Sequence, residues 1–128
     1  MNDIDETDAL FDAQLIIGPT ILAGSPLLRH LHAAGEFDIE DQENWLYLPI
    51  DQTFADKLGC SRYAKEPIGP YTEGMLQQLS ALEASPDGQG ALAGDLGSTV
   101  RTVNAIKRLR DTVKVALING DLILAYRD

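Results

Sequence analysis

The chain has 128 residues, a length typical of one domain, and 45% of them are hydrophobic, as in globular rather than disordered proteins. Its 20 acidic and 10 basic side chains give a net charge of −10. Because phosphate binding depends on Lys and Arg, this charge argues against nucleic acid as a ligand and against docking on anionic lipid. It favours a basic partner, or simply a soluble acidic protein.

Other features of the sequence favour the cytoplasm. The single cysteine, Cys60, cannot form a disulfide within the chain, which fits a reducing compartment. The acidic N-terminal residues lack the basic start and apolar core of a signal peptide. The apolar runs Leu15–Ile17 and Leu122–Ala125 are far shorter than the roughly 20 residues of a membrane-spanning helix. We therefore expect a cytoplasmic protein without a membrane segment.

Half of the acidic side chains lie in two short runs. Like charges at this density repel each other, so each run is expected on a solvated face or loop. The first run lies in residues 1–12, which we expect to form an acidic flexible tail. The members of the two runs are Asp3, Asp5, Glu6, Asp8 and Asp12, and then Glu36, Asp38, Glu40, Asp41 and Glu43.

Between residues 13 and 49, short apolar segments alternate with turn residues. Ser25 followed by Pro26 is a good helix start, and Gly35 is a natural left-handed helix end. These patterns predict, in chain order, a strand or extended segment at Ala13–Ile17, a helix over Leu27–Ala34, an irregular acidic stretch over Phe37–Gln42, and an aromatic and aliphatic patch at Trp45–Leu48.

The rest of the chain is expected to contain longer helices, because hydrophobic residues recur every three or four positions. The run from Ser85 to Gly90 is rich in turn residues and is predicted to be a turn or linker. Further predicted elements are a helix over Gln52–Leu58 capped by Asp51, a loop over 60–70, a helix over Pro70–Ala84, a helix capped by Ser98 with an apolar stripe from Val100 to Leu117, and a strand at Leu122–Tyr126 after the turn at Asn119-Gly120.

These elements indicate an α+β fold that is mostly α-helical, with four or so helices and one or two short strands. We expect one small globular domain over residues 13–128. Within it, residues 91–128 hold the last helix and strand.

The spacing of reactive residues predicts no catalytic or metal site. A nucleophilic cysteine needs a base within hydrogen-bond reach of its thiol, and no spacing in the sequence links Cys60 to either histidine. His30 and His32 are two residues apart on a predicted helix, so their side chains point to nearly opposite faces and cannot bind one metal together. The acidic run lacks the glycine and the final glutamate of a calcium loop. The basic residues from Arg101 to Lys114 are interpreted as balancing carboxylates rather than binding phosphate. We therefore expect no catalytic residue, no metal and no cofactor.

Three segments occur in an order and spacing that match a known family. They are residues 15–19 (LIIGP), 35–49 (GEFDIEDQENWLYLP) and 69–73 (GPYTE). They resemble parts of the AHH-type nuclease toxin domains of bacterial polymorphic toxin systems, within the HNH/endonuclease VII superfamily. In that family the central phrase has the form G-F-D-x-x-D-x-x-N-G-x-x-L-P. The resemblance implies a nuclease-like region over residues 13–84.

The departures from this family concern its active site. The metal and general-base histidines would fall near Gln14 and Leu15, and the later histidine near Gly69, yet none of these residues is histidine. Asn44 resembles the helper asparagine of the family, and the glycine after it is replaced by Trp45. A one-metal nuclease needs a bound cation and a base that activates water. The resemblance therefore implies a degenerate nuclease scaffold without activity.

The leading functional prediction is a non-catalytic protein-binding domain, specifically an immunity protein that binds and neutralises a bacterial nuclease toxin. The partner would be a cognate toxin or effector with a basic surface. The predicted binding residues combine acidic side chains with two aromatic anchors: Glu36, Asp38, Glu40, Asp41, Glu43, Trp45 and Tyr47.

Several alternatives stay open at the level of sequence. The acidic run can equally be a solvated loop above an aromatic core. The protein can be an adaptor or chaperone for a secreted toxin effector, or a metal-dependent HNH-like nuclease that uses Asn44, a histidine and the Asp38–Asp41 carboxylates. A homodimer packed through the last helix is a further alternative, although such a stripe more commonly packs within one chain.

Overall fold

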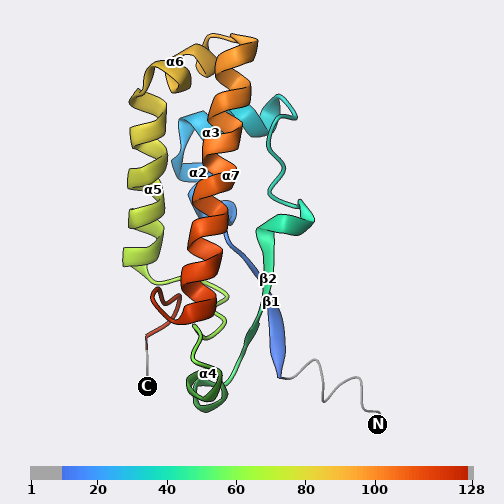
Figure 1. Cartoon of the computed structure of the whole chain (residues 1–128), viewed down its shortest axis with the longest axis vertical. Helices are drawn as coiled ribbons and strands as arrows, with labels where there is room; N and C mark the ends of the chain where they lie inside the picture. Colours follow the sequence, from blue (N-terminus) through green and yellow to red (C-terminus); the bar gives the residue numbers. More distant parts are fainter. Residues whose placement is uncertain (1–9, 127–128) are drawn as a thin grey trace.

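A computed structural model combines a two-stranded antiparallel sheet with long and short helices (Figure 1). It describes residues 10–126. The elements are β1 (Phe11–Leu15), α2 (Pro19–Gly24), α3 (Pro26–Ala33), the 3₁₀ turn η1 (Gln42–Asn44), β2 (Trp45–Pro49), α4 (Gln52–Leu58), α5 (Gly69–Ala84), α6 (Pro86–Leu92) and α7 (Leu96–Asn119). The protein is a small α+β domain that is mostly helical, as predicted.

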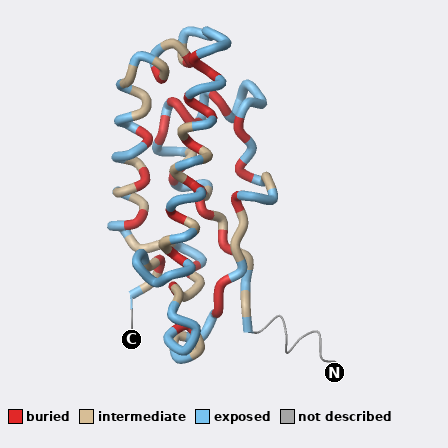
Figure 2. Tube along the Cα trace, in the orientation of Figure 1, coloured by how far each residue is buried: buried red, intermediate tan, exposed pale blue. Residues whose placement is uncertain are grey.

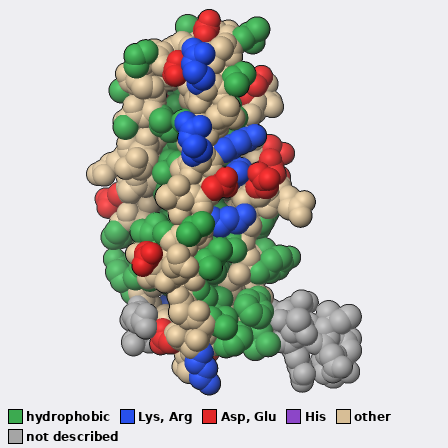
Figure 3. Space-filling model, in the orientation of Figure 1, with side chains coloured by type: hydrophobic (Ala, Val, Ile, Leu, Met, Phe, Trp, Pro, Cys, Tyr) green, Lys and Arg blue, Asp and Glu red, His purple; other side chains and the backbone are tan. Residues whose placement is uncertain are grey.

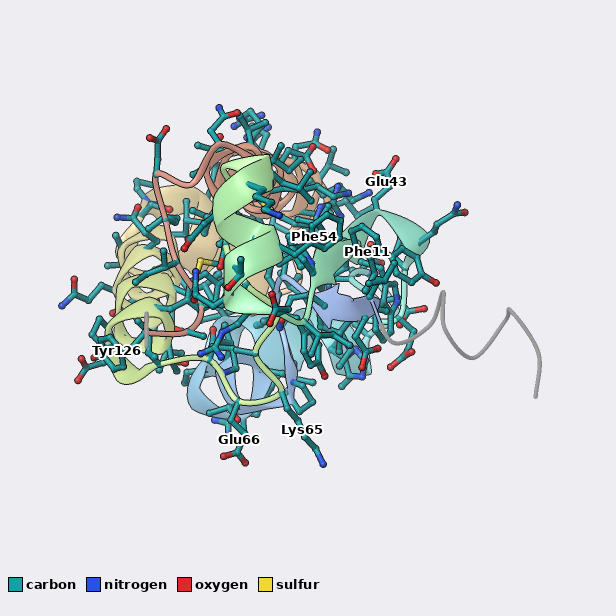
Figure 4. The ribbon with its side chains drawn as sticks, turned by 90° about the horizontal axis from the view of Figure 1, so that it is seen from below. Phe11, Glu43, Phe54, Lys65, Glu66 and Tyr126 are labelled. Carbon is teal, nitrogen blue, oxygen red and sulfur yellow. The ribbon has the colours of Figure 1, made fainter. Side chains whose placement is uncertain are left out.

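The sheet joins two segments that are far apart in the sequence. Phe11 lies opposite Pro49 in the register, and its ring meets Phe54 of α4 edge-on at a centroid distance of 5.5 Å. Figure 4 labels the two residues close together, Phe54 on α4 and Phe11 on β1. β1 therefore begins inside the predicted tail, because strand pairing and this ring contact order Phe11 and Asp12. The rest of the predicted tail, residues 1–9, lies outside the described residues.

The long helices α5 and α7 run along the long axis of the molecule, and α6 joins them at one end (Figure 1). Buried residues follow the inward sides of the helices (Figure 2). Apolar side chains from α3, α5 and α7 form much of the core: Leu27, Leu28, Leu31, Tyr71, Met75, Leu79, Val103, Ile106, Val113 and Leu117. None of the helices between residues 10 and 126 has the length and apolar character needed to cross a bilayer.

Helix ends follow local capping signals. The Asp51 carboxylate accepts the N–H of Phe54 at 3.0 Å, which starts α4 as predicted. The predicted cap of the last helix is wrong by three residues. The carboxylate of Asp95 accepts the N–H of Ser98 at 2.8 Å, so α7 begins at Leu96 and Ser98 lies inside its first turn. Val100, placed in the predicted apolar stripe, is exposed.

The linker predicted at Ser85–Gly90 is instead the start of α6. Ser85 caps this helix by accepting the N–H of Gly88 at 3.1 Å, and Pro86 occupies its first position. A Cβ on Gly88 would overlap the carbonyl oxygen of Leu82. Gly88 therefore allows α6 to pack closely on the end of α5. Glycine serves here for close packing, whereas the prediction assumed that it serves for backbone flexibility in a turn.

The strand predicted at Leu122–Tyr126 does not form. α7 ends at Gly120 in a left-handed conformation with φ of 78°, as the Asn119-Gly120 signal predicts. Beyond it Leu124 is fully buried, and its N–H donates to Ser61 Oγ while its carbonyl accepts the N–H of Ile68, both at 2.9 Å. The segment binds two separate pieces of one loop, so no strand ladder can form.

Candidate partner-binding face and cleft

The acidic segment, defined as residues 36–43, descends beside α7 before it enters β2 (Figure 1). Phe37 and Ile39 are buried, whereas Glu36, Asp38 and Glu40 between and around them are exposed. The alternation turns the apolar side chains into the core and the carboxylates into solvent. The predicted solvated acidic stretch is therefore confirmed in its exposure, and its apolar members anchor it to the core.

Asn44 fastens the end of this segment. It is fully buried, and its Nδ2 donates to the carbonyls of Ile17 and Ile39 at 2.9 and 2.8 Å. Its Oδ1 accepts the N–H of Ile17 at 3.0 Å. Both polar atoms of this amide are thus engaged with backbone groups. Asn44 joins the acidic segment to the residues that follow β1.

Glu43 is held to α7 by basic side chains. Arg110, only 1% exposed, donates from Nη2 to Glu43 Oε1 and from Nε to Asp111 Oδ1, both at 3.0 Å. Lys114 Nζ donates to the Glu43 carbonyl at 2.9 Å. This pairing agrees with the interpretation that basic residues of this helix balance carboxylates. Glu43 differs from the other predicted binding acids because its carboxylate already has a cationic partner within the chain.

The remaining four acids of the predicted site make no ion pair with any residue in the described range 10–126. Asp38 Oδ1 accepts the N–H of Glu40 at 2.9 Å, and Asp41 Oδ1 accepts the N–H of Glu43 at 3.1 Å. These bonds hold the backbone of the segment in local turns. Figure 3 shows acidic side chains gathered on this flank beside a row of basic side chains along α7.

The two predicted aromatic anchors share one face of the sheet. Trp45 and Tyr47 alternate along β2 with inward-facing Leu46 and Leu48, and Tyr47 is 71% exposed. Trp45 is half-buried, and its indole N–H donates to the Glu40 carbonyl at 3.3 Å. This bond fixes the indole ring directly beside the acidic segment. The structure therefore brings Trp45 and the acidic segment together, and it places Tyr47 farther along the same face of β2.

A cleft of about 480 Å³ lies next to Trp45. Its other walls come from the end of β1, the start of α2, the loop from Tyr63 to Pro67, and Thr72 of α5. Figure 4 shows Lys65 and Glu66 projecting from that loop toward solvent. Sequence reasoning assigned no role to this loop, because nothing in its local pattern indicates that it folds back against β1.

The electrostatics of the cleft are set partly by β1. Burial raises the pKa of the Tyr63 phenol above its usual value, and the nearby negative charge of Asp12 raises it further. Gln14, which also lines the cleft, is buried, and its Oε1 accepts the N–H of Ala64 at 2.9 Å. The amide of Gln14 is therefore a structural tie between β1 and the loop.

The other reactive residues are placed as follows. His30 and His32 are both exposed on α3, and His32 Nδ1 lies 3.1 Å from the Phe37 carbonyl oxygen. Cys60 is half-buried, and burial raises the pKa of its thiol. Within residues 10–126, no three or more His, Cys, Asp and Glu side chains are grouped so that they could hold a metal ion.

Two positions assigned by the resemblance to catalytic histidines, Gln14 and Leu15, line the cleft together with Trp45. Gly69, assigned to the later histidine, starts α5, and Thr72 one turn later reaches the cleft. The chain matches no protein-family model, no curated protein and no solved structure. The functional interpretation therefore depends on the geometry of this face.

Proposed function

We propose that this protein is a non-catalytic protein-binding domain, and specifically a cytoplasmic immunity protein that neutralises a basic nuclease toxin. One observation carries the proposal. An acidic segment whose exposed carboxylates have no ion-pair partner among the described residues, Glu43 excepted, is bonded to the half-buried Trp45, and the exposed Tyr47 follows two residues along β2. Aromatic anchors next to charges of one sign are typical of protein interfaces.

The fixed geometry of this face favours binding. Asn44 and the Arg110–Glu43 pair hold the C-terminal end of the acidic segment, and the indole bond to the Glu40 carbonyl orients Trp45. A surface that is ordered before the partner arrives loses less conformational entropy on association. Its negative charge would also speed the encounter with a basic toxin and disfavour acidic partners.

The chemistry of the cleft supports a binding role more than a catalytic one. Gln14 and Leu15 supply neither a metal ligand of the kind that a histidine offers nor a general base. The amide oxygen of Gln14 is already bonded to the Ala64 N–H, and Asn44 is occupied by backbone groups. A partner contacting the acidic face and the cleft would cover the place where the resembled family carries its active site.

The test is co-expression with nuclease toxins encoded beside the gene, with host survival and co-purification as readouts. We expect rescue and a stoichiometric complex. The double variant Glu36→Lys/Glu40→Lys should slow association and lose rescue, because neither of these side chains is hydrogen-bonded to a described residue. Glu73→Lys, an exposed acid on α5, is the matched control and should keep both readouts.

Each other outcome of this test changes the proposal. A complex without rescue would replace the immunity role by that of an adaptor or chaperone. Absence of any complex would remove the proposal. If Glu73→Lys weakened the complex and the double variant did not, the binding face would lie on α5 instead.

A further inference from the structure

We infer that the cleft beside Trp45 receives an arginine side chain from the basic partner. This inference rests on the proposed function, since it names the chemistry that the partner inserts. The cleft, about 480 Å³, falls in the range of small-ligand sites and exceeds what a single bound ion requires. It is continuous with the predicted binding face, because Trp45 belongs to both.

Aromatic rings form two of the walls. Trp45 and Tyr63 both line the cleft, and the indole is held by its bond to the Glu40 carbonyl. The face of an aromatic ring attracts a cation within about 6 Å of its centroid, and indole does so most strongly. A fixed indole offers this face without the entropic cost of ordering it.

Charges around the cleft favour a cation. Glu66 lines it, Asp12 acts on Tyr63 from the adjoining strand, and the exposed Glu40 bonds the indole through its carbonyl. Among the described residues that line the cleft, Lys65 is the one basic side chain. The carboxylates of Glu66 and Asp12 against the one ammonium of Lys65 give the surroundings a net negative charge, which continues that of the acidic segment.

The hydrogen-bonding groups distinguish arginine from lysine. Thr20 and Thr72 line the cleft, and neither hydroxyl bonds to a residue in the range that the structure describes. Their oxygens can accept hydrogen bonds, and the planar guanidinium has N–H donors spread over a fork. A guanidinium can stack on the indole and still donate to a hydroxyl and a carboxylate, which a single ammonium cannot do in one plane.

The experiment uses the isolated full-length protein and the fluorescence of its single tryptophan. The probes are N-acetylarginine amide and N-acetylcitrulline amide, which match in shape and differ in charge, with NaCl added to equalise ionic strength. We expect a saturable change in emission with arginine at millimolar concentration, and about tenfold weaker binding of citrulline, equivalent to about 1.4 kcal/mol.

Three variants locate the response. Glu66→Gln and Tyr63→Leu should each weaken arginine binding several-fold, whereas Lys65→Gln should leave it equal or tighter because a like charge is removed. Glu73→Gln, away from the cleft lining, is the control and should bind as the native protein does. Equal responses to the two probes, or no effect of both Glu66→Gln and Tyr63→Leu, would overturn the inference.

The outcome separates this inference from the proposed function. Co-purification with a toxin and rescue of the host, without selective arginine binding, would keep the immunity role and reject the arginine cleft. Selective arginine binding in the absence of any toxin complex would keep the cleft and reject the immunity role. An arginine-to-citrulline preference that persists in Tyr63→Leu and Glu66→Gln would place the cation at another site.

Discussion

The sheet with its acidic segment and the layer formed by α5, α6 and α7 are held by different kinds of contact. Buried side-chain amides tie the first region, as in the three bonds of Asn44 and the bond of Gln14 to Ala64. An apolar stripe and close backbone contacts at glycines hold the second region, with Gly88 against Leu82 as the clearest case.

The difference shows which kind of contact stabilises each region. Short strands and an extended segment expose many backbone groups and bury few apolar side chains, so polar side chains must satisfy the buried N–H and carbonyl groups. Helices satisfy their own backbone, and their association depends on the volume and shape of side chains. Replacing a buried polar side chain by an apolar one should therefore destabilise the first region most. Adding volume at a close contact should destabilise the second region most.

The largest effect is expected for Asn44→Ala. It leaves two buried carbonyls and one buried N–H without a partner, so the free energy of unfolding should fall by about 4 kcal/mol. Chemical denaturation measures this value. Asn104→Ala, at an exposed position of α7, is the matched control and should change it by less than about 0.5 kcal/mol. Similar losses in the two variants would show that the amide bonds of Asn44 contribute no special stability.

Gly88→Ala should be the most damaging small change in the helical layer. The added methyl group would overlap the carbonyl of Leu82, and we expect a loss of about 3 kcal/mol as α6 is displaced from α5. Gly74→Ala is the control, and its expected effect on stability has the opposite sign. Gly74 lies inside α5 with open space around it, so alanine should stabilise the protein by about 0.8 kcal/mol. Calorimetry of both variants would contradict this interpretation if their melting temperatures shifted in the same direction.

Tyr71→Phe tests a bond that joins the two regions. The phenol of this α5 residue donates to the Ile16 carbonyl at 2.6 Å, and burial raises its pKa. Removing the hydroxyl should lower the free energy of unfolding by about 1.5 kcal/mol, because the buried carbonyl of Ile16 loses its hydrogen-bond partner. The control is Tyr47→Phe, at an exposed ring, which should leave unfolding unchanged.

The raised pKa of Tyr71 also has a consequence at high pH. A group whose pKa is higher in the folded state contributes stability below its unfolded pKa of about 10, and loses it as the pH rises further. The native protein should therefore lose more stability above pH 10 than Tyr71→Phe does. Parallel alkaline unfolding curves would argue against a neutral buried phenol.

The smallest effect is expected at Asp95. Hydrogen bonds from the backbone and side chain of Ser98, with a lesser contribution from the charge of Arg101, lower the pKa of this carboxyl. A lowered folded-state pKa gives stability above the unfolded value of 3.8, which is lost as the pH falls through the folded value. Asp95→Asn keeps a good N-cap but cannot titrate, so its stability should fall less between pH 5 and pH 2. If the stability of Asp95→Asn fell as steeply between pH 5 and pH 2 as that of the native protein, other carboxyl groups would account for the loss of stability in acid.

Local signals predicted those parts of the fold in which backbone groups find their hydrogen-bond partners among residues close by in the sequence. Ser25 caps α3 by accepting the Leu28 N–H, Asp51 caps α4, and Gly120 ends α7, all within a few residues of sequence. The candidate face was predicted partly, because acidic alternation and aromatic residues are visible in the sequence. The binding of Glu43 by Arg110 was not, since 67 residues separate the two.

The sequence by itself determined the helical periods, the caps of α3 and α4, the end of α7 and the exposure of the acidic segment, because each depends on residues close together in the chain. Tertiary structure decided the rest. Turn-rich residues became α6 because Gly88 fits against α5, and an apolar C-terminal run became a buried, irregular segment because Ser61 and Ile68 bind its backbone. The cleft exists because the Tyr63–Pro67 loop folds back to β1, and contacts between distant segments have no signature in local sequence.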